Sequence, residues 1–535
     1  MTIGLGEILA ALALIVAALA YLHDRMVAKR DLPPDPVLQF RELPNDERIS
    51  AFLEWRYELS TRLFGRDDAM AELEDWARNG ERVAFRILTG PGGAGKSRLA
   101  AHVARGLKND GWIAGFAESD RLPVVRRAGL FLILDYPEER RARTAALVRQ
   151  ALTVKSRAPI RLLLVSRKDR EDWSDLIAQT HARGSWSTAD LAVTALTAER
   201  TADLVEAVFD RLSTRLGRPR PSIDRPAILD WFETDRQHGL PLFATAAAMD
   251  AVLNGAVRLS LGRDAVIALA KRESDRLGNA SVDIGLGPDA LPRLAGFAAL
   301  TGGLHERAVN ALTDPALDTG LAARPGLLDT VRRAGWWRDD QFPAPAPDLL
   351  AVQMTLDVLD SAGDRRPKWL GRLLADLDDS GITRLGRLCH DAVTLHGAKE
   401  HRLGAWLEQA IATLPDAALR VLSSNDQLPW RLAKLGAKAT ASLLDRSIDD
   451  ETRATLLNNR SVYLGDAGDG VGALAAIGEA VAIRRRLAAG NAARFEPDLA
   501  SSLHNLSNEL SASGDGAGAL AAIGEAVAIR RRLAA

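Results

Sequence analysis

The sequence predicts a multidomain chain in which an α/β part, a parallel sheet with helices on both faces, is followed by all-α segments. Three observations indicate this. Short apolar stretches alternate with helical stretches between residues 82 and 190, a pattern typical of a parallel sheet. After Leu191 the strand signals fade and long amphipathic helical patterns take over. Near the C-terminus a long segment recurs without a change, which indicates stacked helical repeats.

The composition excludes several classes of protein. The 535 residues, 47% hydrophobic and 26% charged, are typical of a globular chain of several domains. The net charge is -1, so no overall field favours nucleic acid, and no nucleic-acid partner is expected. The single cysteine, Cys389, excludes an intramolecular disulfide and is better explained as a small buried apolar residue than as a nucleophile.

The N-terminus carries an apolar run without charge from Ile8 to Leu22. Arg25, Lys29 and Arg30 follow it, and the positive-inside rule then places the rest of the chain in the cytoplasm. We predict a transmembrane anchor at residues 1–22, a single-pass protein of the inner (cytoplasmic) membrane, and a proline-stiffened linker at 23–48. Two alternatives are a cleaved signal peptide, since Ala18-Leu-Ala20 resembles a cleavage site, and a buried helix.

A phosphate-binding loop lies in the predicted core, residues 49–190, between a strand at 83–89 and a helix at 96–108. The loop Gly90-Pro-Gly-Gly-Ala-Gly-Lys-Ser97 matches GxxxxGK[ST] in full. Lys96 should reach the β- and γ-phosphates of ATP or ADP, and the Ser97 hydroxyl should bind Mg²⁺. The predicted nucleotide-binding set here comprises Gly90, Pro91, Gly92, Gly93, Ala94, Gly95, Lys96, Ser97 and Arg98.

Two further strands end in residues suited to this chemistry. The apolar strand 130–134 is followed by Asp135, where a carboxylate would hold Mg²⁺ through water. The strand 160–165 is followed by Ser166 and Arg167, and a guanidinium there would sense the γ-phosphate, although a surface arginine is the alternative. We therefore predict Lys96, Asp135 and Arg167 as the catalytic residues.

The acid that would polarise water is not identified by the sequence. The residue after Asp135 is Tyr136 rather than a second acid. Glu138 and Glu139 are candidates, but a solvated loop is the favoured interpretation of each. Slow hydrolysis, as in a switch, is the expectation.

The order of these motifs resembles the STAND class of signalling NTPases, which includes the NB-ARC proteins, and in particular a bacterial branch. Besides the loop and the strand ends, Phe64-Gly-Arg66 and Gly239-Leu-Pro-Leu242 carry the resemblance. It implies that Pro241 packs near the adenine and that Arg66 lies near the base and ribose. It also implies a helical lid at 191–285 and a winged-helix-like part at 286–346, with a further helical region at 347–449.

The repeats occupy residues 450–535. Gly472–Ala489 recurs unchanged at Gly518–Ala535, and each unit reads as a helix, a Gly-Asp turn and a second helix. This resembles tetratricopeptide repeats, in the long-period form seen in kinesin light chain, and implies that the repeats bind a partner protein. The last helix is apolar and has no polar cap, so either the full protein is longer or this end binds something.

These observations favour a membrane-anchored, ATP-binding signalling switch with slow ATPase activity. ADP would hold the domains closed, and exchange for ATP would open them and permit assembly into a nucleotide-dependent homo-oligomer. A tetratricopeptide scaffold at the membrane, with a structural or inactive nucleotide site, is the alternative. A transcription regulator is a third hypothesis, disfavoured because no DNA-reading motif is recognisable.

Overall fold

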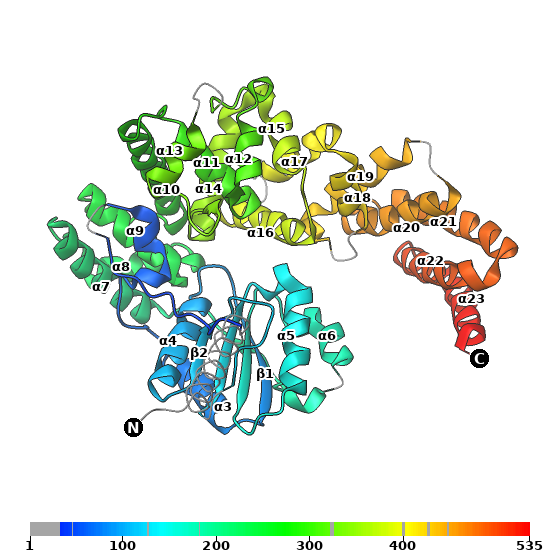
Figure 1. Cartoon of the computed structure of the whole chain (residues 1–535), viewed down its shortest axis with the longest axis horizontal. Helices are drawn as coiled ribbons and strands as arrows, with labels where there is room; N and C mark the ends of the chain where they lie inside the picture. Colours follow the sequence, from blue (N-terminus) through cyan, green and yellow to red (C-terminus); the bar gives the residue numbers. More distant parts are fainter. Residues whose placement is uncertain are drawn as a thin grey trace, which may run out of the picture. The chain divides into compact units, whose positions relative to one another are not determined.

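The chain forms two compact units in the structure, a computed structural model (Figure 1). The described residues are 33–44, 47–125, 128–180, 182–321, 326–397, 402–424, 428–446 and 449–534. One unit, the sheet unit, comprises the described residues up to Arg41 together with Thr61–Arg200. The other, the helical unit, comprises Glu42–Ser60 and Thr201–Ala535.

The sheet unit is built on five parallel strands in the order β2-β3-β4-β1-β5. The strands are β1 (Val83–Thr89), β2 (Ile113–Phe116), β3 (Leu130–Asp135), β4 (Ile160–Val165) and β5 (Leu191–Ala192). The helices between them are α3 (Asp67–Asn79), α4 (Lys96–Asn109), η2 (Pro137–Arg140), α5 (Arg141–Thr153), η3 (Glu171–Trp173), α6 (Ser174–Gln179) and η4 (Arg183–Ser185).

Helices cover both faces of this sheet, as predicted. Leu147 and Val148 of α5 and Trp173, directly before α6, share a buried cluster with alternate strand residues on one face. On the opposite face α4 packs against β2, β3 and β4, and Trp76 of α3 meets Phe131 of β3 edge-on (Figure 1). Burial on both faces explains why β3 and β4 read as nearly continuous apolar runs.

Arg161 is the one charged residue inside these two runs, and it is fully buried in β4. Its guanidinium donates hydrogen bonds to the backbone carbonyls of Trp76 and Gly80 at the end of α3. Carbonyls at the end of a helix lack helical partners. Arg161 satisfies that of Gly80 and is a second donor to that of Trp76, which also accepts from the N–H of Gly80. Burial lowers the pKa of Arg161 to about 10.

The helical unit is almost entirely α-helical. Its first helices are α2 (Ile49–Leu53), η1 (Trp55–Tyr57), α7 (Ala198–Leu216), α8 (Arg225–Glu233), η5 (Arg236–Gly239), α9 (Pro241–Asn254) and α10 (Gly262–Asp283). The middle comprises α11 (Ala290–Thr301), β6 (Leu304–His305), α12 (Glu306–Leu312), η6 (Pro315–Leu317), α13 (Leu327–Arg333) and β7 (Gln341–Phe342). In the middle section β6 pairs antiparallel with β7. The description of residues 286–346 as winged-helix-like stays a prediction.

The remaining helices lead into the repeats. They are α14 (Asp348–Ser361), η7 (Gly363–Arg365), α15 (Arg366–Leu373), α16 (Asp379–His396), α17 (Leu403–Ala410), η8 (Ile411–Thr413), α18 (Asp416–Ser424), η9 (Trp430–Leu432) and α19 (Ala433–Leu444). Cys389 is fully buried within α16, and burial raises the pKa of its thiol to about 12. It therefore has the properties of a core residue rather than of a nucleophile.

The segment Glu42–Ser60 belongs to the helical unit. The sequence predicts instead a division of this segment between the linker, which ends at residue 48, and the core, which begins at residue 49. Glu273 of α10 accepts hydrogen bonds from the backbone N–H of Ile49 and the hydroxyl of Ser50. Ile49 and Phe52 are buried. This carboxylate, together with the apolar side of α2, attaches the segment to the helical unit rather than to the sheet unit.

The repeats consist of α20 (Asp450–Asp466), α21 (Gly470–Gly490), α22 (Ala492–Ala512) and α23 (Gly516–Ala534). The two Gly-Asp turns have the same geometry. Gly468 and Gly514 adopt φ angles of 84° and 89°, a left-handed conformation that favours glycine. Asp469 and Asp515 then accept hydrogen bonds from the N–H groups three residues on, as N-caps do.

The predicted membrane anchor at residues 1–22 lies outside the described residues. Within the described part of the chain, every helix is too short or too polar to pass through a bilayer. The prediction of a single-pass protein of the inner membrane, with its body in the cytoplasm, is wrong on this finding.

His238 connects three elements of the helical unit and is fully buried. Its Nδ1 lies 2.9 Å from the carbonyl oxygen of Trp231, and its Nε2 accepts a hydrogen bond of 3.1 Å from the N–H of Gly262. The imidazole stacks on the Trp231 ring at 3.8 Å. With Nε2 accepting, the ring is neutral and carries its proton on Nδ1. Burial lowers the pKa of His238 below its ordinary value of 6.5.

We therefore expect the helical unit to lose stability in mild acid. As pH falls below 6.5, the unfolded chain binds a proton that the folded state excludes, so the free energy of unfolding falls until the folded-state pKa is passed. The His238→Gln variant should be less stable at neutral pH but should lack this part of the pH dependence. Thermal midpoints of both chains at about pH 8 and about pH 5.5 test this, and equal acid-induced shifts would contradict it.

Candidate nucleotide-binding site

The loop Gly90–Gly95 joins β1 to α4 and has the backbone form that its glycines permit. Gly90 has a φ angle of 147°, and a Cβ at this position would lie 2.4 Å from the carbonyl oxygen of Val193. No other residue fits there without moving the chain. Gly95, at a φ angle of 88°, is the N-cap of α4. The loop therefore leads directly into the N-terminus of a 14-residue helix, where backbone N–H groups and the helix dipole favour an anion.

Lys96 is the first residue of α4, and its side chain turns back over the loop. The ammonium donates hydrogen bonds to the carbonyl oxygens of Gly90 at 2.7 Å and Pro91 at 3.0 Å. These carbonyls hold the positive charge beside the loop backbone. The charge is thus positioned for phosphate oxygens bound in the loop.

Ser97 and Asp135 come together from different elements. Ser97 lies in the first turn of α4 and Asp135 is the last residue of β3. The Ser97 hydroxyl donates a hydrogen bond of 3.1 Å to Oδ1 of Asp135. A hydroxyl and a carboxylate side by side provide oxygen ligands of the kind that Mg²⁺ prefers. No cluster of three or more His, Cys, Asp or Glu side chains among the described residues could hold a metal, so the predicted Mg²⁺ site depends on this pair.

Arg167 also lies against the loop. A Cβ added to Gly92 would meet Nη2 of Arg167 at 3.0 Å, so the guanidinium occupies the space that a side chain at Gly92 would need. Arg167 follows β4, which lies between β1 and β3 in the sheet. The structure therefore brings Lys96, Asp135 and Arg167 to one edge of the sheet.

Arg66 contacts the loop from the segment before α3. Its Nη2 donates hydrogen bonds to the carbonyl oxygens of Ala94 at 3.0 Å and Thr194 at 2.8 Å. Arg66 is buried, and burial lowers its pKa. It thereby ties the loop to the segment after β5, a contact that sequence reasoning missed. Its predicted place near the base and ribose stays a prediction.

Two further residues predicted to bind nucleotide are Arg98 and Pro241. Arg98 contacts the segment before α3, and Pro241 lies in the helical unit. Arg98 donates a hydrogen bond of 3.3 Å to the carbonyl of Arg62, which ties α4 to the segment before α3. Pro241 begins α9 in the helical unit, where proline suits the first helical position. Its contact with an adenine stays a prediction.

Glu138 is hydrogen-bonded and only partly exposed, which differs from the solvated loop predicted for it. It lies in η2, directly after β3, and its Oε2 accepts a hydrogen bond of 2.9 Å from the Ser166 hydroxyl. The Ser166 hydroxyl in turn accepts one of 2.9 Å from the N–H of Lys168. Tyr136, at a φ angle of 51°, makes the turn that brings η2 back toward β4. The sequence signal that could have indicated this contact of Glu138 is the hydroxyl residue Ser166, directly before Arg167.

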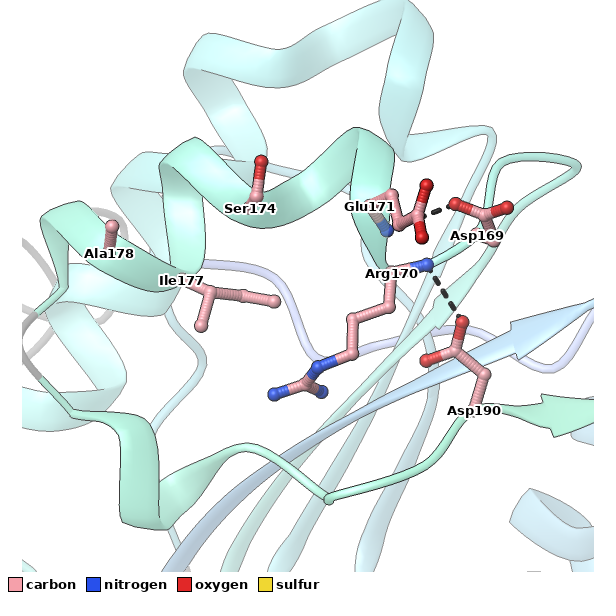
Figure 2. Close-up of a pocket in the computed structure, with 7 residues that line it drawn as sticks. All are labelled: Asp169, Arg170, Glu171, Ser174, Ile177, Ala178 and Asp190. Atoms are coloured by element: carbon pink, nitrogen blue, oxygen red, sulfur yellow. Dashed lines mark hydrogen bonds between the residues drawn. The ribbon is translucent and has the colours of Figure 1, made fainter.

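A separate cavity of about 710 Å³ lies beside α6 and contains none of the predicted residues (Figure 2). It is lined by Asp169, Arg170, Glu171, Ser174, Ile177, Ala178 and Asp190. The N–H of Arg170 donates to Asp190 at 2.8 Å, and its guanidinium donates to the carbonyl of Ser187. Burial raises the pKa of Asp190. These bonds tie the start of η3 to the segment before β5, which is a structural role.

Comparison with known proteins bears on the C-terminal part and on the fold. The family model described as tetratricopeptide repeat matches residues 499–534. No curated protein matches the sequence. One similar solved structure is a Signal Transduction ATPase with Numerous Domains (STAND) protein with a tetratricopeptide repeat sensor, from Pyrococcus horikoshii. It is 9% identical, with a TM-score of 0.27, and the match covers 88% of this chain and 77% of that chain.

Two other solved structures are similar. The Walker-type ATPase of Pyrococcus abyssi is 13% identical, with a TM-score of 0.26, over 55% of this chain and 99% of that chain. The ORC2 protein of Aeropyrum pernix, solved as ADPNP-ADP complexes, is 15% identical, with a TM-score of 0.29, over 60% of this chain and 99% of that chain.

The parallel sheet and the family match confirm the predicted fold class. The chain is a multidomain protein in which an α/β core with a phosphate-binding loop precedes helical segments and a C-terminal tetratricopeptide repeat, and it is similar to a STAND protein with the same kind of repeat.

Proposed function

We propose that this protein is an ATP-binding signalling switch of STAND type, a slow ATPase whose repeats bind a partner protein. The observation that carries the proposal is the meeting of Lys96, the Ser97–Asp135 pair and Arg167 at one edge of the parallel sheet. A cation, two oxygen ligands and a guanidinium around a helix N-terminus are the groups that phosphoryl transfer uses.

Each side chain has a role in this proposal. Bound ATP with Mg²⁺ supplies a phosphoanhydride bond that water can cleave. Lys96 exchanges its two carbonyl partners for phosphate oxygens and balances their charge. Ser97 and Asp135 hold the metal, and Arg167 senses the terminal phosphate. Because the loop is already fixed by Arg66, little reorganisation is needed when the nucleotide binds.

Glu138 is our proposed water-polarising acid. The residue after Asp135 is Tyr136, so a carboxylate must come from elsewhere. Glu138 is held by Ser166, which follows β4 and directly precedes Arg167. A carboxylate three residues beyond the metal ligand, engaged with a serine, is consistent with slow turnover.

Switching requires that ATP and ADP bind the two conformations with different affinities. The terminal phosphate is the only difference between the two nucleotides, and Arg167 is the proposed group that detects it. In this proposal ADP favours a closed form, and ATP favours an open form that assembles into a homo-oligomer. A partner protein that binds the repeats more tightly in one of these two forms shifts the equilibrium between the closed and the open form.

A tetratricopeptide scaffold with a structural nucleotide site is the second candidate, and Tyr136 in the place of a second acid favours it. The two candidates differ in turnover. A scaffold binds ATP without hydrolysing it and without changing its hydrodynamic size.

We expect Lys96→Ala to weaken ATP binding by about 100-fold, because two charge-assisted hydrogen bonds to phosphate are lost. Lys108→Ala, at the exposed end of the same helix, is the matched control and should bind normally. Asp135→Asn should retain ATP binding but lose its dependence on Mg²⁺. Isothermal titration with and without Mg²⁺ measures all three. Equal ATP affinity in Lys96→Ala and in the unmodified chain would contradict the nucleotide site.

We expect Glu138→Gln to lower the rate of ATP hydrolysis by about 100-fold or more while leaving ATP affinity unchanged. The glutamine amide can still accept the Ser166 hydrogen bond, so only the charge and the basicity are removed. Glu139→Gln, at the neighbouring position, is the control. Single-turnover hydrolysis at saturating ATP makes the comparison. Full activity in Glu138→Gln would assign the acid to another residue.

A further inference from the structure

Ser166 is a buried polar residue at the edge of the sheet that carries the candidate site. It directly follows β4 and is 1% exposed. Its N–H donates a hydrogen bond of 3.0 Å to the carbonyl oxygen of Leu88 in β1, two residues before the phosphate-binding loop begins. The backbone of Ser166 is therefore fixed to the strand that leads into the loop.

The Ser166 hydroxyl makes two hydrogen bonds that together define its orientation. Its oxygen accepts from the N–H of Lys168 at 2.9 Å, and its proton is donated to Oε2 of Glu138, also at 2.9 Å. A serine hydroxyl has one proton and two acceptor lone pairs. Because the N–H of Lys168 can only meet a lone pair, the hydroxyl proton is left for the Glu138 carboxylate.

The first of these hydrogen bonds closes a turn around Arg167. A hydroxyl that accepts from the N–H two residues further on forms a tight turn with its own backbone, and Arg167 is the residue that this turn encloses. The guanidinium of Arg167 lies beside Gly92 of the loop. One hydroxyl thus contacts both the turn that carries the proposed phosphate sensor and the carboxylate proposed to polarise water.

Glu138 depends on this hydroxyl for its orientation. Within the described part of the chain, the Ser166 hydroxyl is the one hydrogen-bond partner of the Glu138 carboxylate. The side chain of Glu138 is partly exposed, and a glutamate side chain gains considerable rotational freedom when it is released. Without Ser166 the carboxylate would sample several orientations toward solvent.

We propose that Ser166 is a positioning residue for ATP hydrolysis. Its hydroxyl binds Oε2 of Glu138 and so presents Oε1, the other carboxylate oxygen, to the attacking water. The water oxygen forms a bond to the terminal phosphorus, the bond from that phosphorus to the oxygen retained by ADP breaks, and the water proton passes through Glu138 to the released phosphate. Ser166 itself touches neither water nor nucleotide. This inference deepens the proposed function and rests on it.

A purely structural role for the hydroxyl predicts a different outcome. The Ser166→Ala variant removes one oxygen atom and introduces no crowding. Lys168 is exposed and Glu138 is partly exposed, so water can replace the hydroxyl as a partner of both. We therefore expect Ser166→Ala to fold with a thermal midpoint close to that of the unmodified chain. A positioning role lowers the rate of hydrolysis although the fold is kept.

The test is a double-mutant cycle of ATP hydrolysis measured on the full chain. Ser166→Ala should lower kcat about tenfold, which is part of the loss expected when the acid itself is removed. The KM for ATP should stay unchanged, because the phosphate-binding loop and Lys96 are intact. In the Glu138→Gln chain the acid is already absent, so adding Ser166→Ala should lower kcat no further.

Ser187→Ala is the matched control. The N–H of Ser187 donates to the carbonyl of Phe85 in β1, as that of Ser166 donates to Leu88, but its position is on the other side of that strand, before β5. This variant should hydrolyse ATP at the unmodified rate.

Three results would overturn the inference while ATP hydrolysis by the unmodified chain stands. They are an unchanged kcat in Ser166→Ala, a rise in KM that accounts for its lower activity, and a further loss of kcat when Ser166→Ala is added to Glu138→Gln. Isothermal titration with ATP separates these results from a failure of the proposed function. An unmodified chain that binds no ATP, or that binds ATP without hydrolysing it, contradicts the slow ATPase and this inference with it.

Discussion

Parallel strands send the loops at their carboxyl ends to the same edge of a sheet, and the candidate site depends on this constraint. Val165, the last residue of β4, pairs with Leu88 of β1 on one side and with Asp135 of β3 on the other. The three strands therefore end level with one another. The same edge of the sheet thus carries the phosphate-binding loop, Asp135 and the Ser166–Arg167 pair. Up to 77 residues (167 - 90) separate these groups in the sequence. A shift of β4 by one residue would move Arg167 away from Gly92 and Ser166 away from Glu138.

Two buried arginines stabilise this arrangement without carboxylate partners. Arg161 binds the carbonyls that end α3, and Arg66 binds a carbonyl of the phosphate-binding loop and one after β5. Hydrogen bonds from a charged donor are stronger than neutral ones, and each guanidinium has several donors in a fixed plane. Helix α3 is thus fixed at both ends, because Arg66 directly precedes it and Arg161 binds the carbonyls at its C-terminal end. The hydrogen bond from Arg66 to Ala94 also fixes the loop. The desolvation that lowers the pKa of both arginines is the cost of this rigidity.

Much of the fold could be predicted from the sequence, because its determinants are local. The strands expected at 83–89 and 160–165 have those bounds, and the glycines of the loop carry their own backbone requirement. Asp135 was found because an apolar strand ending in a carboxylate is a local pattern. The interactions of Glu138 and Arg66 were missed because each depends on a partner from a distant segment, Ser166 and Thr194. The attachment of Glu42–Ser60 to α10 depends on Glu273, more than 200 residues away.

The central claim is that the sheet unit holds a nucleotide whose terminal phosphate changes the state of the chain. The most direct measurement is to identify the nucleotide that remains bound through purification and then to measure sedimentation of the full chain in ADP and in ATP with Mg²⁺. The account predicts about one ADP or ATP per chain and a larger or more extended species in ATP. A chain that retains and rebinds no nucleotide, or that binds both with identical sedimentation, would contradict it.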